Sequence, residues 1–159
     1  NGVQVSPASE HKHLGLLMSG NGTWQSHIEN MTAKAWKRIK IIEKSNLNWT
    51  VKYYFSFIRP ILEYADIVWD NCSMHERKDL DTIQDEAARI VTGATKLVSL
   101  NVLHNDVCWD ILQERRQKHK LIQIFKMKNN LCPEYLTSLV PSDVGGRNPY
   151  NSLTNHLIL

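Results

Sequence analysis

Residues 55–93 constrain the fold more than any other part of the chain. They begin with an apolar run containing Pro60, which lacks a backbone donor and clashes with the preceding turn, so a kinked or broken helix is expected there. After a turn, Ser73 and Glu76 have the spacing of a capping box. Apolar residues then follow at intervals of three and four up to Gly93, a natural helix stop. This segment therefore predicts a helical hairpin.

Further helices are expected on both sides of this hairpin. A second capping box, Ser26 with Glu29, precedes apolar residues at helical spacing and predicts a helix over residues 26–44. Asn48 suits the cap of the helix that contains Pro60. The predicted buried stripe of that helix is Val51, Tyr54, Phe55, Ile58 and Leu62. Later helices are predicted at residues 99–104, 110–129 and 134–139, the last headed by Pro133.

The N-terminal residues have a different pattern. Residues 3–18 are weakly strand-like and lead into the turn-rich residues 19–22, which predicts a short hairpin. The expected fold class is mainly α, with a short N-terminal β-hairpin followed by a bundle of about five or six helices. The expected organisation is a hairpin and turn over 1–22, helices over 23–95, a C-terminal helical extension over 96–140 and a loop or tail over 141–159.

Composition narrows the class of protein. With 42% hydrophobic and 22% charged residues in 159, the chain is expected to be one folded domain. It begins with Asn1 and not Met, so we expect it to be a piece of a longer protein. Its apolar runs fall far short of a membrane span, so we expect an intracellular protein, in the nucleus or cytoplasm. The three cysteines are widely spaced and are expected to stay reduced. The net charge of +3 barely favours nucleic acid, so any basic surface must come from clustering.

The motifs that would indicate an enzyme do not occur in the sequence. It has no Asp-Asp pair for two-metal polymerase chemistry, no glycine-rich phosphate loop and no nucleophile motif. His11 and His13 could hold a metal, but no further ligand follows at a suitable spacing, so an exposed histidine pair is the better interpretation. We therefore expect no catalytic residues, no metal ligands and no cofactor in this chain.

Two predicted helices have a basic side that could follow a phosphate backbone. Basic helix sides are also commonly just solvated, and the sequence leaves both interpretations open. The candidate nucleic-acid-binding residues are Lys34, Lys37, Lys40 and Lys44 in the first helix and Arg115, Arg116, His119, Lys120 and Lys126 in the long one. In the long helix, one half of the helical wheel is apolar, formed by Ile111, Leu121, Ile122, Ile124 and Phe125.

Several short phrases share their order and spacing with one family. The chain resembles the region that follows the polymerase core in reverse transcriptases of non-LTR (LINE-type) retrotransposons. The phrases are HKHLG at 11–15, Trp24 with His27 and Ile28, IRPILEY at 58–64, AAR at 87–89, ERR at 114–116, PEYL at 133–136 and RNPYN at 147–151. Two departures are a histidine at position 13 in place of tyrosine and a glycine-rich stretch before Trp24.

The resemblance implies a role for each part of the chain. Residues 23–95 would be thumb-like, and His13, Leu14 and Gly15 would lie in a primer-grip-like hairpin. The partners would be the backbone of an RNA–DNA or RNA template–primer and the palm and fingers of the parent polymerase. Two Mg ions would belong to that palm, not to this chain. The family's catalytic acids have no match here, so this chain alone is not expected to be an enzyme.

Two other hypotheses remain open at the level of sequence. The chain could be the product of a degenerate open reading frame with no present role. Alternatively, it could be a domesticated helical module that binds a protein through apolar surface left exposed by the absence of the polymerase domains.

Overall fold

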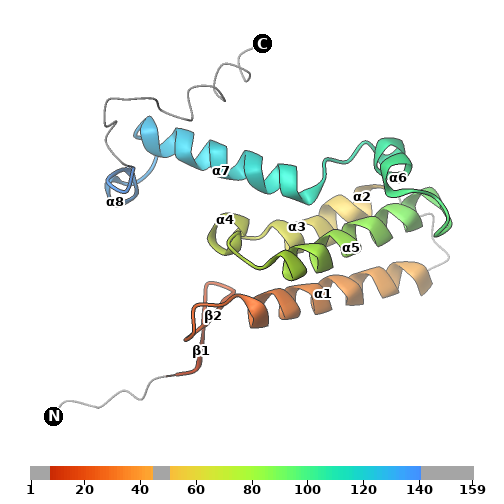
Figure 1. Cartoon of the computed structure of the whole chain (residues 1–159), viewed down its shortest axis with the longest axis horizontal. Coiled ribbons are helices and arrows are strands. Elements are labelled where there is room, and N and C mark those ends of the chain that lie inside the picture. Colours follow the sequence, from red (N-terminus) through yellow and green to blue (C-terminus); the bar gives the residue numbers. More distant parts are fainter. Residues whose placement is uncertain (1–7, 45–50, 141–159) are drawn as a thin grey trace. The chain divides into compact units, whose positions relative to one another are not determined.

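The computed structural model describes residues 8–44 and 51–140. These residues form a two-stranded hairpin followed by helices, which confirms the predicted fold class (Figure 1). In chain order the elements are β1 (Glu10–His13), β2 (Leu16–Ser19), α1 (Gln25–Lys44), α2 (Val51–Tyr53), the π-helix η1 (Tyr54–Ile58), α3 (Arg59–Glu63), α4 (Asp66–Trp69), α5 (Met74–Thr92), α6 (Leu100–Val107), α7 (Leu112–Lys128) and α8 (Glu134–Thr137). The chain divides into two compact units, residues 1–119 and 120–159.

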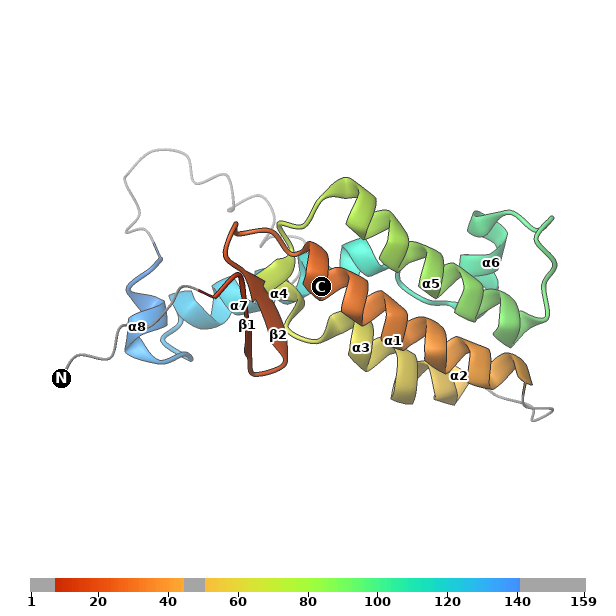
Figure 2. The same cartoon turned by 90° about the horizontal axis from the view of Figure 1, so that it is seen from below.

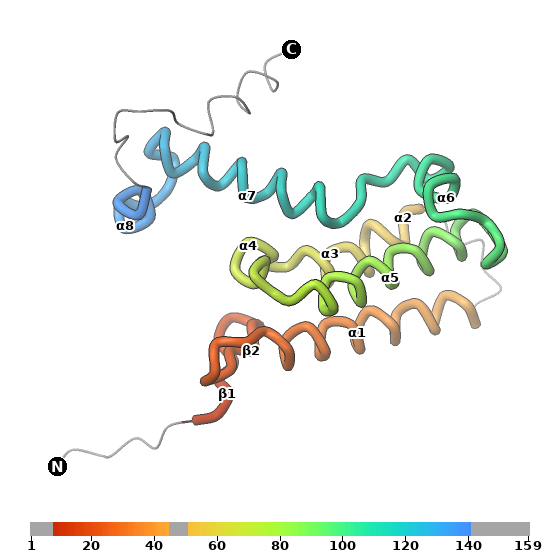
Figure 3. The backbone as a smooth tube through the Cα atoms, in the orientation of Figure 1, coloured from red at the N-terminus to blue at the C-terminus, as the bar shows by residue number. Residues whose placement is uncertain are grey.

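The first unit has a core formed by three helical segments. Helix α1 and helix α5 run in the same direction, and the α2–η1–α3 segment runs in the opposite direction (Figures 1 and 3). Seen from below, α1 lies over both neighbours (Figure 2), and it contacts α5, α3 and η1. The buried residues of α1 include Ile28, Met31, Ala35, Ile39 and Ile42, which confirms the stripe predicted for this helix.

The N-terminal hairpin closes with a two-residue turn. Strands β1 and β2 are antiparallel, with His13 opposite Leu16. Leu14 and Gly15 both have positive φ, as tight hairpin turns require. The Tyr64 hydroxyl donates a hydrogen bond to the Leu14 carbonyl, and a Cβ at Gly15 would lie 3.4 Å from the Tyr64 ring. A hairpin was predicted, but its first strand begins at Glu10; residues 3 and 5, which carried the predicted alternation, lie outside the described residues.

His27 joins the hairpin to the core. Its side chain is buried at the start of α1, and its Nδ1 accepts a hydrogen bond from the Leu17 backbone N–H at 3.3 Å. The proton of the neutral ring therefore sits on Nε2, which is buried and has no hydrogen-bond partner among the described residues. Burial lowers the pKa of His27, and the positive charge of Lys34 lowers it further.

The capping box predicted at Ser26 is wrong. Helix α1 already begins at Gln25, because the Trp24 carbonyl accepts the first helical hydrogen bond, from the Ile28 N–H at 2.9 Å. The Ser26 hydroxyl instead donates to the Glu10 carboxylate of β1, while Glu29 accepts from the Gln25 amide at 2.9 Å. Both side chains of the predicted box are thus bonded to other groups.

Pro60 disrupts its helix as expected. It sits in the first turn of α3, and the preceding residues widen into η1. A π-turn contains more residues than an α-turn, so the buried positions shift along this segment. Tyr53, Tyr54, Ile58 and Leu62 are buried. Val51 and Phe55, which were predicted to be buried, are exposed, and the predicted cap at residue 48 lies outside the described residues.

Helix α5 follows its prediction most closely. The Ser73 hydroxyl accepts a hydrogen bond from the Glu76 N–H at 3.3 Å, and the Glu76 carboxylate accepts from the Ser73 N–H at 2.6 Å, so the capping box is complete. Gly93 ends the helix with a φ of 69°. Gln84 was not predicted to be buried, and its amide donates to the Asp110 carbonyl at 2.9 Å.

The boundaries of the last three helices differ from the predictions of 99–104, 110–129 and 134–139: α6 is shifted toward the C-terminus, and α7 and α8 are shorter. Trp109, ahead of α7, is buried and stacks on Tyr54 with ring centroids 3.9 Å apart, an aromatic contact within the first unit. In the second unit Pro133 is the N-cap of α8 and not its first helical residue. Within residues 8–44 and 51–140, no helix combines the length and apolar character needed to cross a bilayer.

The complete capping box predicts a measurable cost for its loss. We expect Ser73→Ala to lower the free energy of unfolding by about 1 kcal/mol, because the Glu76 N–H loses its acceptor. Thr82→Ala is the matched control, since Thr82 is an exposed residue in the middle of α5. Urea denaturation of both variants measures the difference; equal losses would contradict the role assigned to Ser73.

The buried His27 predicts a loss of stability in mild acid. Its folded pKa lies below the unfolded value of about 6.5, so the unfolded state takes up a proton first as the pH falls. The stability that neutral His27 contributes is fully present above about pH 6.5. It is lost as the pH falls through the folded pKa, and the free energy of unfolding then drops by at most about 1.4 kcal/mol per pH unit. Urea denaturation across this range should show a shallower pH dependence for His27→Gln than for the wild type.

The control for this prediction is His75→Gln. His75 lies in α5 with a largely exposed side chain. That variant should follow the pH dependence of the wild type, and a shallower curve for it would show that the effect is not specific to His27.

Candidate nucleic-acid interface

The lysine side of α1 is open to solvent. Lys34, Lys37, Lys40 and Lys44 are all exposed, and Lys37 and Lys44 lie nearly opposite the buried stripe at 100° per residue. Among the described residues, no carboxylate oxygen lies within 4 Å of these four ammonium groups, so no carboxylate neutralises them. We call these four residues the lysine face.

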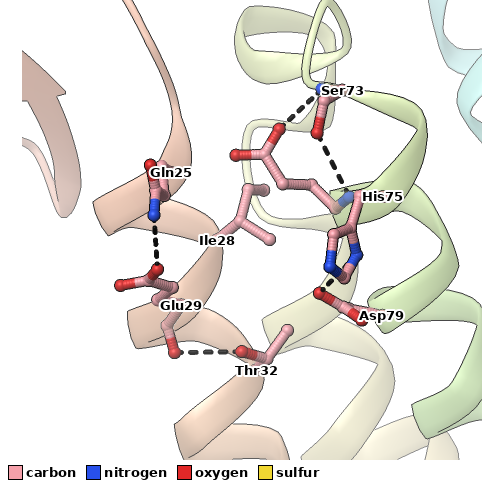
Figure 4. Close-up of a pocket in the computed structure, with 8 residues that line it drawn as sticks. Gln25, Ile28, Glu29, Thr32, Ser73, His75 and Asp79 are labelled. Carbon is pink, nitrogen blue, oxygen red and sulfur yellow. Dashed lines mark hydrogen bonds and ion pairs between the residues drawn. The ribbon is translucent and has the colours of Figure 1, made fainter.

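The two flanks of α1 differ in charge. On the flank toward α5, residues of both helices line a shallow cavity of about 290 Å³ (Figure 4). Glu29, Glu76 and Asp79 make this cavity acidic, and His75 points toward Asp79 with a separation of 3.4 Å. On the flank toward η1, the Arg38 guanidinium lies 5.7 Å from the centre of the Phe57 ring. Positive charge on α1 is therefore found on the lysine face and the η1 flank.

The basic residues at the start of α7 are turned inward. Three acidic residues of the α3–α4 segment pair with three residues of α7, and we call these pairs the acid–base ladder. Its pairs are Glu63–Arg115, Asp66–His119 and Asp70–Arg116. The Arg116 side chain is only 3% exposed, so the interior of the first unit, and not solvent, surrounds it.

The geometry of the ladder differs from pair to pair. Arg115 contacts Glu63 through both Nε and Nη2, with Nη2 to Oε2 at 2.8 Å. His119 Nδ1 lies 2.5 Å from Asp66 Oδ2, and Arg116 Nε lies 3.6 Å from Asp70 Oδ1. Burial raises the pKa of Glu63, while the hydrogen bond and charge of Arg59 oppose that shift. The ladder therefore occupies three of the predicted binding residues with internal contacts.

The residues that were predicted to form the apolar half of the long helix are mostly exposed. Arg116 is buried, whereas four members of the predicted apolar half are exposed. These are Ile111, Ile122, Ile124 and Phe125. The sequence carried no local signal for this arrangement, because the extended Tyr64 and the left-handed Ala65 separate Glu63 from Asp66, so spacing along one helix does not bring the acids together.

The other candidate residues lie in separate places. In the second unit, Lys126 is exposed and Lys120 is half-buried. In the hairpin, His13 is exposed and Leu14 lies at the turn, with its side chain in solvent. The rings of His11 and His13 are 6.2 Å apart. No group of three potential metal ligands occurs in the part of the chain that the structure describes.

Comparison with known proteins gives two curated relatives from Drosophila melanogaster. Over 162 residues the chain is 22% identical to a probable RNA-directed DNA polymerase from transposon X-element, an alignment covering 96% of this chain and 18% of that protein. Over 125 residues it is 22% identical to a probable RNA-directed DNA polymerase from transposon BS, covering 74% and 14%. The chain is distantly related to transposon RNA-directed DNA polymerases. It spans less than a fifth of either relative.

Two further comparisons find nothing similar. No protein-family model matches the chain, and no solved structure does. The similarity to the two polymerases therefore rests on sequence alone, over most of the chain.

The ladder predicts that Arg115 contributes to stability. We expect Arg115→Ala to lower the free energy of unfolding by about 2–4 kcal/mol, because it leaves a largely buried carboxylate at Glu63 with one of its two arginine partners. Lys118→Ala is the matched control on the same helix, because its pair with Asp110 is exposed and screened by solvent, so its loss should change stability much less. Urea denaturation compares the two, and losses of equal size would argue against a structural ladder.

Proposed function

We propose that the chain is a thumb-like and connecting segment of a retrotransposon reverse transcriptase and that it contacts the backbone of a template–primer. Two observations support this parentage: both relatives are probable RNA-directed DNA polymerases from transposons, and their alignments cover 96% and 74% of this chain. In the intact parent, RNA-directed DNA synthesis and its two Mg ions would belong to the palm, and this chain alone would not polymerise. Such a protein would work in the nucleus or the cytoplasm.

The observation that carries the binding proposal is the lysine face. Four exposed ammonium groups on one helix, none within 4 Å of a carboxylate among the described residues, can each neutralise a phosphate and release a counterion. Such contacts position a nucleic acid without reading its bases, so the binding is independent of sequence. The ladder residues Arg115, Arg116 and His119 are assigned a structural part in this proposal, because acids of the segment 63–70 already pair with them.

The test is salt-dependent binding of a labelled RNA–DNA hybrid to the whole chain. The double variant Lys37→Glu with Lys40→Glu should weaken binding at low salt. It should also make the slope of log affinity against log salt shallower by about two, roughly one for each lost phosphate contact. Fluorescence anisotropy over a salt series measures both quantities.

The matched control changes the same charge elsewhere. Lys78→Glu with Lys96→Glu alters two exposed lysines of the first unit, one on α5 and one after it. This variant should bind the hybrid more tightly than the lysine-face variant and keep a slope near that of the wild type. If both variants weakened binding equally, the effect would come from the net charge of the chain and not from the lysine face. The absence of hybrid binding by the wild type at low salt would remove the proposal.

A further inference from the structure

Phe57 is an exposed aromatic residue held in a defined position. Its side chain is 45% exposed, although it belongs to the π-helix that packs against α1. The ring of Tyr53, which is buried, stacks on it with centroids 4.6 Å apart and planes at 28°. The Arg38 guanidinium lies over the ring at 5.7 Å. Contacts from two different elements therefore fix the ring at the surface.

The π-helix explains why this ring is exposed. Pro60 removes a donor in the following turn, and the preceding residues widen into η1. The wider turn places Tyr53, Tyr54 and Ile58 in the core and leaves Phe57 outside it. Short π-segments inside α-helices occur frequently at functional sites.

The surroundings of Phe57 are basic. Arg38 lies one turn after Lys34 on the η1 flank of α1, beside the lysine face. Within the described residues, Arg38 has no carboxylate within 4 Å, so its charge is available to a ligand. An exposed ring next to uncompensated cations has the two properties of sites that bind single strands: bases stack on the ring and cations contact the phosphates.

Phe55 provides an internal comparison in the same π-helix. It is also exposed and also lies near an arginine, with Arg59 at 5.0 Å from its ring. Arg59, however, is paired with Glu63 at 3.1 Å, and the edge of Phe55 packs against Trp109 at 5.8 Å. The surroundings of Phe55 are therefore charge-compensated, unlike those of Phe57.

We propose that Phe57 is a stacking site for an unpaired base and that Arg38 and the lysine face contact the flanking phosphates. The ligand is a single-stranded stretch of RNA or DNA, since stacking on a ring does not depend on base identity or on the sugar. Arg38 moves from the ring to a phosphate when the base takes its place. This inference rests on the proposed function, and it adds that an unpaired strand stacks on the Phe57 ring, which paired strands do not use, while both kinds of strand contact the lysine face.

The test measures affinity of the whole chain for a labelled single strand of roughly ten nucleotides, within the usual site size, and for the blunt RNA–DNA hybrid of the same sequence. Phe57→Leu keeps apolar bulk and removes the stacking surface. It should weaken single-strand binding roughly fivefold to a hundredfold and leave hybrid binding nearly unchanged. Phe57→Tyr should restore single-strand affinity, and Phe55→Leu should behave as the wild type.

The outcomes separate this inference from the proposed function. If Phe57→Leu binds the single strand as the wild type does, while the lysine-face variant has lost binding, the stacking site is overturned and the proposed function stands. Equal losses with Phe55→Leu would also overturn it. If the wild type binds neither probe at low salt, both proposals fail. A crosslink from a thiouridine-containing single strand tests the site in the wild type, without any variant. The expected adduct is on the peptide that contains Phe57, and adducts found only on other peptides would overturn the stacking site.

Discussion

The acid–base ladder is the interaction on which the rest of the first unit depends. Buried charges are tolerated only when they are paired, so the acids of α3 and α4 and the cations of α7 must meet. Arg116 meets this constraint only in part: its side chain is 3% exposed and its Nε lies 3.6 Å from Asp70, while Nη1 and Nη2 are buried with no hydrogen-bond partner among the described residues. The side of α7 that carries Arg116 therefore faces the interior of the first unit, and Leu112, one turn before Arg116, is buried with it.

The ladder also determines where positive charge remains available. The chain has a net charge of only +3, and two arginines of α7 are paired with acids inside the first unit. On α1, the lysine face and Arg38 have no carboxylate within 4 Å among the described residues, and they lie on neighbouring sides of one helix. A small net charge is thus compatible with a basic surface, because acids are used internally or gathered on the flank facing α5. Local compensation, and not total charge, defines the candidate interface.

Local signals in the sequence were sufficient for some elements and insufficient for others. Ser73, Glu76 and Gly93 act on backbone groups within their own helix, so their pattern alone predicted both ends of α5. Ser26 has the same pattern, yet its hydroxyl bonds to Glu10, a contact with a different element that no local pattern contains. The same limit applies to the η1 segment, where Pro60 predicted a break but not the widened turn that leaves Phe55 exposed.

The residues of the candidate site also divide into those that one helix determines and those that depend on contacts between elements. The lysines of α1 were predicted correctly to be opposite the apolar stripe, because amphipathic spacing is a property of one helix. The basic side of α7 looked equivalent on a helical wheel, and only the position of the acids on another segment distinguishes it. The phrases that carry the family resemblance contain these very acids and bases: Glu63 lies in one phrase and Arg115 in another. Their pairing gives the resemblance a physical basis, because both phrases are needed to satisfy one buried contact. The ladder accounts for the scaffold of the first unit, and whether the chain binds nucleic acid depends on the charges that this scaffold leaves uncompensated.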